Sequence, residues 1–135
     1  DEASKDLTPF IGHQQLSVIR DLAHGEESAW FITRMVELAA HISTMPKVYE
    51  QDGKGDAAIV GLHYFTDSAD WYITECDLDG PQHQAFGLAD LFGDGGELGY
   101  ISIAEIIRCG AELDLHFMPR TLATVRRERN SRLAA

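Results

Sequence analysis

The run Trp71-Tyr72-Ile73-Thr74-Glu75-Cys76-Asp77 joins aromatic and β-branched residues, which favour strands, to acidic residues at its end. An apolar run from Ala57 to Phe65 precedes it, and the polar segment from Thr66 to Asp70 separates the two. Two strand-like runs joined by a short polar turn predict a β-hairpin. The first run is apolar on both faces, as expected for a central strand covered on one side and partly shielded on the other.

Three further segments predict additional strands. Gln84 to Leu91 and Leu98 to Ile101 are strand-like and lie on either side of a glycine-rich turn, residues 93–96. Residues 113–117 alternate apolar and polar side chains, which is typical of a half-buried strand. The sheet is therefore expected to be mostly antiparallel, with about four to five strands.

Helices are predicted at both ends of this sheet. Thr8 followed by Pro9 can open a first helix that ends at Gly25. A second helix starts after an acidic first turn and stops at Pro46, because apolar residues recur at helical spacing in between (Phe31, Met35, Leu38 and Ile42). Downstream, Ser102 and Glu105 have the spacing of a capping box for a short helix through Arg108 that Gly110 can end, and Thr121 begins the last helix.

The order of these elements indicates the α+β class, with an N-terminal helical pair packed on the sheet and short helices near the C-terminus. A chain of 135 residues fits one domain, spanning 1–135, in which we expect residues 1–9 and 127–135 to be flexible ends. Asp1 to Asp6 lack the basic start and apolar stretch of a secretory signal, and no apolar run approaches the ~20 residues of a membrane span. We therefore expect a cytoplasmic protein that does not contact membranes.

Charge is distributed unevenly along the chain, whose formal net charge is -11. Residues 1–119 carry 21 acidic and 6 basic side chains, whereas residues 120–135 carry 5 arginines and one glutamate. An acidic body repels a phosphate backbone, so direct nucleic-acid binding is not expected from it. The arginines of the tail favour a solvated last helix, and the alternative is a nucleic-acid accessory protein that binds through this tail.

Five carboxylates lie near the predicted strand ends, and they are Glu75, Asp77, Asp90, Asp94 and Glu97. Together with His63 or His116 they allow the alternative of a metal-dependent hydrolase or nuclease. Residues 90–101 do not fit a calcium loop, because Phe92 and Ile101 stand where ligands are required. The chain also lacks the H-E-x-x-H, phosphate-loop and G-x-S-x-G signatures, so we assign no catalytic residue, no metal and no cofactor.

Aromatic residues near these carboxylates have two interpretations. Trp71 and Tyr100 are most often core or half-buried sheet residues, but either one, if exposed beside carboxylates, suits a protein-binding hot spot. The two cysteines, Cys76 and Cys109, show no metal or disulfide spacing and are expected to be buried free thiols.

Three ordered motifs resemble an uncharacterised family of small bacterial proteins, classed as a domain of unknown function and found largely on plasmids, phages and integrative elements. They are W-Y-I-T-E-C-D at 71–77, F-G-L-A-D at 86–90 and E-L-G-Y-I-S-I-A-E at 97–105. The resemblance covers roughly residues 57–125, and Leu7 to His13 is similar to the longer proteobacterial members. The resemblance implies that the gene for this protein lies on a mobile element. It identifies no catalytic residue in this chain.

The leading hypothesis combines this context with the acidity of the chain. Mobile elements often carry small acidic proteins that disable host defence proteins by placing carboxylates where phosphates would bind. We therefore expect a non-enzymatic interaction protein that contacts a basic host protein, as an inhibitor of the anti-restriction or anti-CRISPR type. The predicted partner-binding residues are Glu75, Asp77, Asp90, Asp94, Glu97, Trp71 and Tyr100, and the five carboxylates among them are expected to form one outward patch. A two-fold homodimer is the commonest assembly for such a protein.

Overall fold

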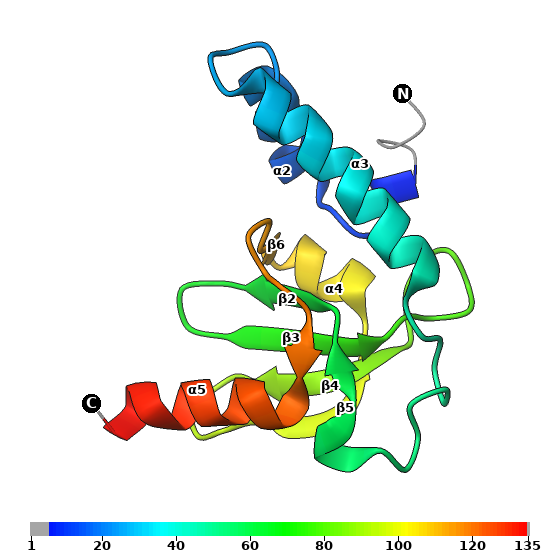
Figure 1. The fold of residues 1–135 in the computed structure, drawn as a ribbon, viewed down its shortest axis with the longest axis vertical. Helices are drawn as coiled ribbons and strands as arrows, with labels where there is room; N and C mark the ends of the chain where they lie inside the picture. The colour runs from blue at the N-terminus through cyan, green and yellow to red at the C-terminus, as the bar shows by residue number, and fades with distance from the viewer. Residues whose placement is uncertain (1–5, 135) are drawn as a thin grey trace.

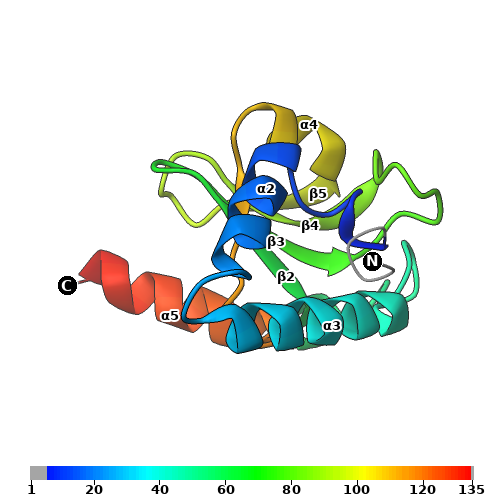
Figure 2. The same cartoon turned by 90° about the horizontal axis from the view of Figure 1, so that it is seen from above.

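A computed structural model describes the backbone of residues 6–134 and the side chains of residues 6–131. Two helices, α2 (His13–Leu22) and α3 (Ser28–Thr44), lie at one end of the molecule, and the last helix, α5 (Leu122–Ala134), lies at the other (Figure 1). Seen from above, α2 lies between α3 and the short helix α4 (Ile103–Arg108), in front of the strands (Figure 2). The predicted α+β class is confirmed.

The main sheet has five antiparallel strands in the order β5-β4-β3-β2-β6. Their bounds are Leu62–Phe65 for β2, Asp70–Glu75 for β3, Ala85–Asp90 for β4, Glu97–Ile101 for β5 and Glu112–Leu113 for β6. A second, two-stranded sheet pairs β1 (Ile59–Val60) with β7 (Arg120–Thr121). The 3-10 turn η1 (Gly55–Ala57) directly precedes β1. The predicted hairpin is β2 and β3, in the register Leu62 opposite Ile73.

Alternation along the strands creates two separate cores, one on each face of the sheet. One face carries Leu62, Tyr64 and Ile73, which pack with buried residues of α2, α3 and α4. The opposite face carries Tyr72 and Leu88, which pack with Val60 of β1 and with Phe117, Leu122 and Val125 at the C-terminal end. Both faces of the central strands are thus covered, and α5 is the cover for the second face.

The helix boundaries follow from local chemistry. Met45 is extended because the residue before a proline avoids the helical region, so α3 ends at Thr44 before Pro46. Ser102 caps α4 by accepting a bond from the backbone N–H of Glu105, which confirms the N-cap that the predicted capping box places at Ser102. Gly110 follows that helix with a φ of 98°, the left-handed conformation expected for it.

Two sequence predictions of secondary structure were wrong in detail. The helix expected to open at Thr8 is α2, which begins only at His13, because Gly12 is extended (φ -61°, ψ 149°) and separates it from the helical residues Asp6 and Leu7. The strand expected over residues 113–117 pairs with β2 only at Glu112 and Leu113. The carboxylate of Asp114 accepts the N–H of His116 at 3.0 Å, which turns the chain away from the sheet.

The two segments expected to be flexible fall partly outside the described residues, since nothing is described for residues 1–5 and 135. Within the described part, Leu7 is fully buried in the core on the α2–α3 face. Residues 127–134 continue α5.

Arginines of the C-terminal segment fasten α5 to the sheet. The guanidinium of Arg129 donates to Asp70 at 3.2 Å, to the hydroxyl of Tyr72 at 2.9 Å and to Asp90. Arg126 pairs with Asp56 at 3.1 Å, and Arg120 pairs with Glu128 at 2.6 Å. Because Asp56, Asp70 and Asp90 belong to the acidic body, the positive tail neutralises part of its charge, whereas Glu128 pairs within the tail.

His63 extends this network across β2. Its Nε2 lies 2.7 Å from Asp70 and its Nδ1 lies 3.0 Å from Asp114, while its ring stacks on Tyr72 with centroids 4.5 Å apart. Carboxylates only accept, so both ring nitrogens must carry protons. Burial lowers the pKa of His63, but the bonds to Asp114 and Asp70 outweigh it and raise that pKa above 6.5. In return, the hydrogen bond from His63 lowers the pKa of Asp114.

Replacing Arg129 should destabilise the protein strongly, because it leaves the fully buried side chain of Asp90 without its cation. We expect Arg129→Met to lower the free energy of unfolding by about 3 to 5 kcal/mol, measured by urea denaturation. Arg127→Met is the matched control, because Arg127 is exposed and, among the described residues, bonds only to Thr124, and it should change stability by less than about 0.5 kcal/mol. Equal effects of the two variants would show that the network does not hold α5.

The protonated His63 predicts a characteristic pH dependence. Since its pKa is higher in the folded state, its contribution to stability is complete below about pH 6.5 and is lost as the pH rises through the raised pKa. The free energy of unfolding of the wild-type protein should therefore fall as the pH rises through the raised pKa of His63. His63→Phe should flatten the curve above about pH 6.5, whereas His83→Gln, a change at an exposed histidine, should keep it. An unchanged slope in His63→Phe would contradict the assignment.

Candidate functional site

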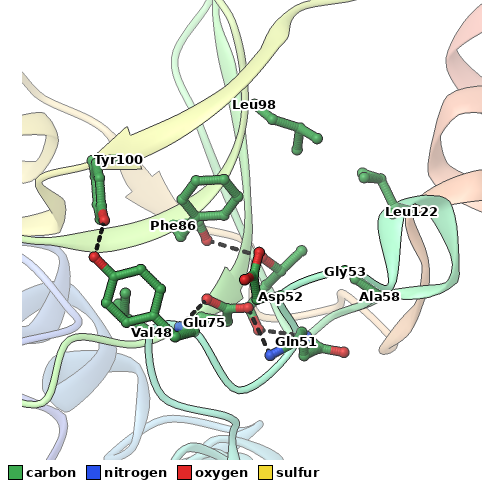
Figure 3. A pocket seen from close by; sticks show the side chains of 13 residues that line it. Val48, Gln51, Asp52, Gly53, Ala58, Glu75, Phe86, Leu98, Tyr100 and Leu122 are labelled. Atoms are coloured by element: carbon green, nitrogen blue, oxygen red, sulfur yellow. Dashed lines mark hydrogen bonds between the residues drawn. The ribbon is translucent and has the colours of Figure 1, made fainter.

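A pocket of about 370 Å³ opens on the sheet face that α5 covers only in part (Figure 3). It lies between the loop after α3, the ends of β3, β4 and β5, and the first residue of α5. We call it the aromatic pocket, and the described residues that line it are Val48, Tyr49, Gln51, Asp52, Gly53, Gly55, Ala58, Thr74, Glu75, Phe86, Leu98, Tyr100 and Leu122. It exists because α5 covers Tyr72 and Leu88 but not Phe86, Leu98 and Tyr100 further along the same face.

Glu75 fixes the loop that forms one wall of the aromatic pocket. One oxygen of its carboxylate accepts the N–H of Tyr49 at 2.8 Å, and the other accepts the N–H of Gln51 at 2.9 Å. Glu75 is only 4% exposed. A buried carboxylate requires such partners, so the loop is folded over the end of β3.

Gln51 secures the same loop from the other side. Its side-chain amide donates to the carbonyls of Ile59 and Thr74 at 3.0 and 2.8 Å and accepts the N–H of Ile59 at 2.8 Å. Upstream, the N–H of Val48 donates to the carbonyl of Cys76, and the N–H of Cys76 donates to the carbonyl of Pro46. The loop is therefore held by hydrogen bonds to the end of β3 and to Cys76 just after it.

Three aromatic rings give the pocket its character. The hydroxyls of Tyr49 and Tyr100 are hydrogen-bonded at 2.6 Å (Figure 3). The ring of Phe86 meets that of Tyr100 edge to face, with centroids 5.7 Å apart and planes at 88°. Tyr49 is 69% exposed and Tyr100 is 56% exposed, although both have large apolar rings. Tyr49 also has a φ of 79°, a strained backbone conformation for a residue with a side chain.

The pocket is electrostatically negative. Of the described residues that line it, Asp52 and Glu75 carry the charges, and both are acidic. The hydrogen bond between its hydroxyl and that of Tyr49 raises the pKa of Tyr100 above 10, and the nearby carboxylates of Glu75 and Asp52 raise it further. Chemically, the pocket offers apolar surface and aromatic rings beside a buried negative charge.

The structure divides the predicted partner-binding residues among several places. Two of the five carboxylates are buried: Glu75 under the loop, and Asp90 at 1% exposure, where it pairs with Arg129 and accepts the N–H of Gly93. The expectation that all five face outward in one patch therefore does not hold for this pair. Asp77 lies in the loop after β3, and its carboxylate accepts the N–H groups of Asp79 and Gln84.

The remaining predicted residues lie nearer to the edge strand β5. Asp94, Glu97 and Tyr100 are exposed and line a second, shallower hollow beside Phe92, which is 85% exposed. By the register of β3, β4 and β5, Trp71 and Glu97 share the face that packs against α2 and α3, whereas Tyr100 points to the opposite face. Trp71 is partly buried against that core.

Sequence reasoning missed the residues that complete the aromatic pocket. Tyr49 and Gln51 fall in a segment that reads as an ordinary surface loop, and Phe86 and Leu98 read as sheet residues of unknown exposure. Leu122 belongs to a helix that is distant in sequence. The one available signal was Tyr49 itself, a large aromatic residue beside the polar, glycine-containing segment 51–56.

The side chains named in the alternative functions have other neighbours. His63 lies between Asp70 and Asp114, and the ring of His116 stacks on Trp30 with centroids 5.0 Å apart. Within residues 6–134, no group of three or more His, Cys, Asp and Glu side chains is arranged to hold a metal ion. Of the two free cysteines, Cys76 is buried as expected, but Cys109 is exposed, because it follows the last turn of α4 at the surface.

Comparison with known proteins identifies a family but no activity. Of the described helices, none has the length and apolar character that crossing a membrane requires. No curated protein and no solved structure matches the chain. A family model described as a protein of unknown function, DUF2958, matches residues 32–128, a segment that runs from α3 into α5 and contains every strand. The expectation of a domain of unknown function is thus confirmed, and the chain belongs to the DUF2958 family.

Proposed function

We propose that this protein is a non-enzymatic interaction protein that binds a basic partner protein through the aromatic pocket and the adjoining edge of β5. The observation that carries the proposal is the exposure of Tyr49 and Tyr100 at the rim of an apolar cavity. Tyrosine supplies a large contact area with little conformational entropy to lose, and hot spots of protein interfaces are enriched in it.

The edge strand supports this location of the surface. β5 has a neighbour on one side only, β4, so backbone groups on its outer side are open to a partner. Exposed apolar side chains cluster along the same edge, at Leu91, Phe92 and Leu98. An open strand beside an apolar pocket suits an extended partner segment, which gains affinity from backbone hydrogen bonds and specificity from side chains placed in pockets.

The charge of the protein supports a basic partner. The formal net charge is -11, and Asp52, Asp94 and Glu97 are exposed around the two hollows beside β5. Several tail arginines are paired internally, which leaves these carboxylates unopposed at the rim. Complementary charges speed association and select partners, and they make the complex sensitive to salt.

The three motifs resemble proteins found on mobile elements, and this resemblance suggests what the partner is. We propose a host nucleic-acid-binding defence protein in the cytoplasm, bound by a protein that a plasmid, phage or integrative element supplies. Such a partner has a basic groove for phosphates, and an acidic protein can occupy that groove in place of nucleic acid.

Removal of Tyr100 tests the proposal. The tagged wild-type protein captures its partner from a lysate of the native host, and the partner is then purified for affinity measurements. We expect Tyr100→Ala to weaken the complex by about tenfold or more, because the variant loses the aromatic rim. Affinity for the wild type should also fall when salt is raised from about 50 to about 300 mM.

The matched control is Ile32→Ala, which removes an equally exposed apolar side chain from α3, away from the pocket. It should leave the affinity unchanged, and neither variant should shift the thermal midpoint appreciably. A partner that binds Tyr100→Ala and Ile32→Ala equally well would show that the interface is elsewhere.

A further inference from the structure

We propose that the aromatic pocket receives a single cationic side chain, the guanidinium of an arginine or the ammonium of a lysine, from the partner protein. This inference rests on the proposed function and names the chemistry that the pocket recognises. It begins from Glu75, whose carboxylate lines the pocket although the residue is 4% exposed.

Glu75 is a buried negative charge without a positive neighbour. Its two oxygens accept one backbone N–H each, but among the described side chains it forms no ion pair. Asp90, the other buried carboxylate, differs in this respect, because Arg129 pairs with it. Buried charges are normally compensated, and each oxygen of Glu75 has a second lone pair to offer.

The walls of the aromatic pocket, like the charge of Glu75, suit a cation. Phe86 and Tyr100 stand at 88° to one another, and Tyr49 closes the third side through its hydroxyl bond to Tyr100. The faces of aromatic rings attract cations through their quadrupoles, most strongly where water is excluded. The apolar side chains of Leu98 and Leu122 offer contact for the aliphatic stem that carries such a head group.

The same chain uses this combination elsewhere, with the cation in place. The guanidinium of Arg129 lies 5.4 Å from the ring centre of Tyr72 and pairs with Asp70 and Asp90. Arg120 lies 4.4 Å from the ring centre of Phe117 and pairs with Glu128. In the aromatic pocket the rings and the carboxylate are supplied without the arginine, and a basic partner would supply it.

Small neutral and cationic probes of equal shape test the inference. The 135-residue protein, labelled with ¹⁵N, is titrated with N-acetyl-arginine methylamide and N-acetyl-lysine methylamide, and the amide signals of Tyr49, Gln51 and Gly53 are followed. The neutral counterparts are the citrulline and norleucine derivatives. We expect the cationic probes to shift these signals, with an affinity about tenfold or more above that of their neutral counterparts.

Two variants and a control locate the effect. Tyr100→Leu keeps an apolar side chain but loses the ring, so it should reduce the preference for cations while leaving norleucine binding unchanged. Glu75→Gln should abolish the preference, although its amide also faces the loop N–H groups and can loosen the loop. Glu37→Gln removes an exposed charge from α3, away from the aromatic pocket and from β5, and should behave like the wild type.

The outcomes separate this inference from the proposed function. Equal binding of arginine and citrulline probes, or no shift with any probe, would overturn the cationic occupant, while a partner complex that still depends on Tyr100 would keep the interaction surface. If Tyr100→Ala left the affinity of the partner complex unchanged, both the proposed interaction surface and its cationic occupant would be wrong. Loss of cation preference in Glu37→Gln would place the recognising charge outside the pocket and would also overturn the inference.

Discussion

The carboxylate of Glu75 is the point on which the candidate site depends. It lies at the end of the central strand β3, buried among apolar groups, and a charge there is tolerated only if hydrogen-bond donors face it. The donors are the N–H groups of Tyr49 and Gln51, so the chain after α3 must fold back over the sheet. That requirement places Tyr49 against Tyr100 and forms the pocket between residues about fifty positions apart in sequence.

The strain at Tyr49 fits this account. Gly53 and Gly55 also have positive φ in the same loop, but glycine adopts that conformation without cost, whereas tyrosine does not. A strained residue persists when its surroundings over-determine it, and such residues concentrate at binding sites. The exposed ring of Tyr49 has no role in either core, so the strain is associated with the surface of the pocket and not with packing.

A second charge system, centred on Arg129, has a structural role. It holds α5 against the sheet through Asp70, Asp90 and Tyr72, and His63 links Asp70 to Asp114 on the neighbouring segment. Because α5 begins at Leu122, its position also sets one wall of the pocket. The arginine-rich tail, which from composition suggests a nucleic-acid arm, thus has internal partners at Arg120, Arg126 and Arg129.

The sequence by itself determined the α+β class, the β2–β3 hairpin, the capped helix after Ser102 and the end of α3 before Pro46, because period, capping and proline geometry act over a few neighbouring residues. It also pointed to Glu75 and Tyr100, but it could not distinguish a buried carboxylate from an exposed one. Exposure depends on what packs over a residue. Only the tertiary structure decided that Glu75 and Asp90 are buried and that Tyr49, Phe86 and Leu122 meet in one pocket. These facts arise from contacts between distant segments, which no local pattern encodes.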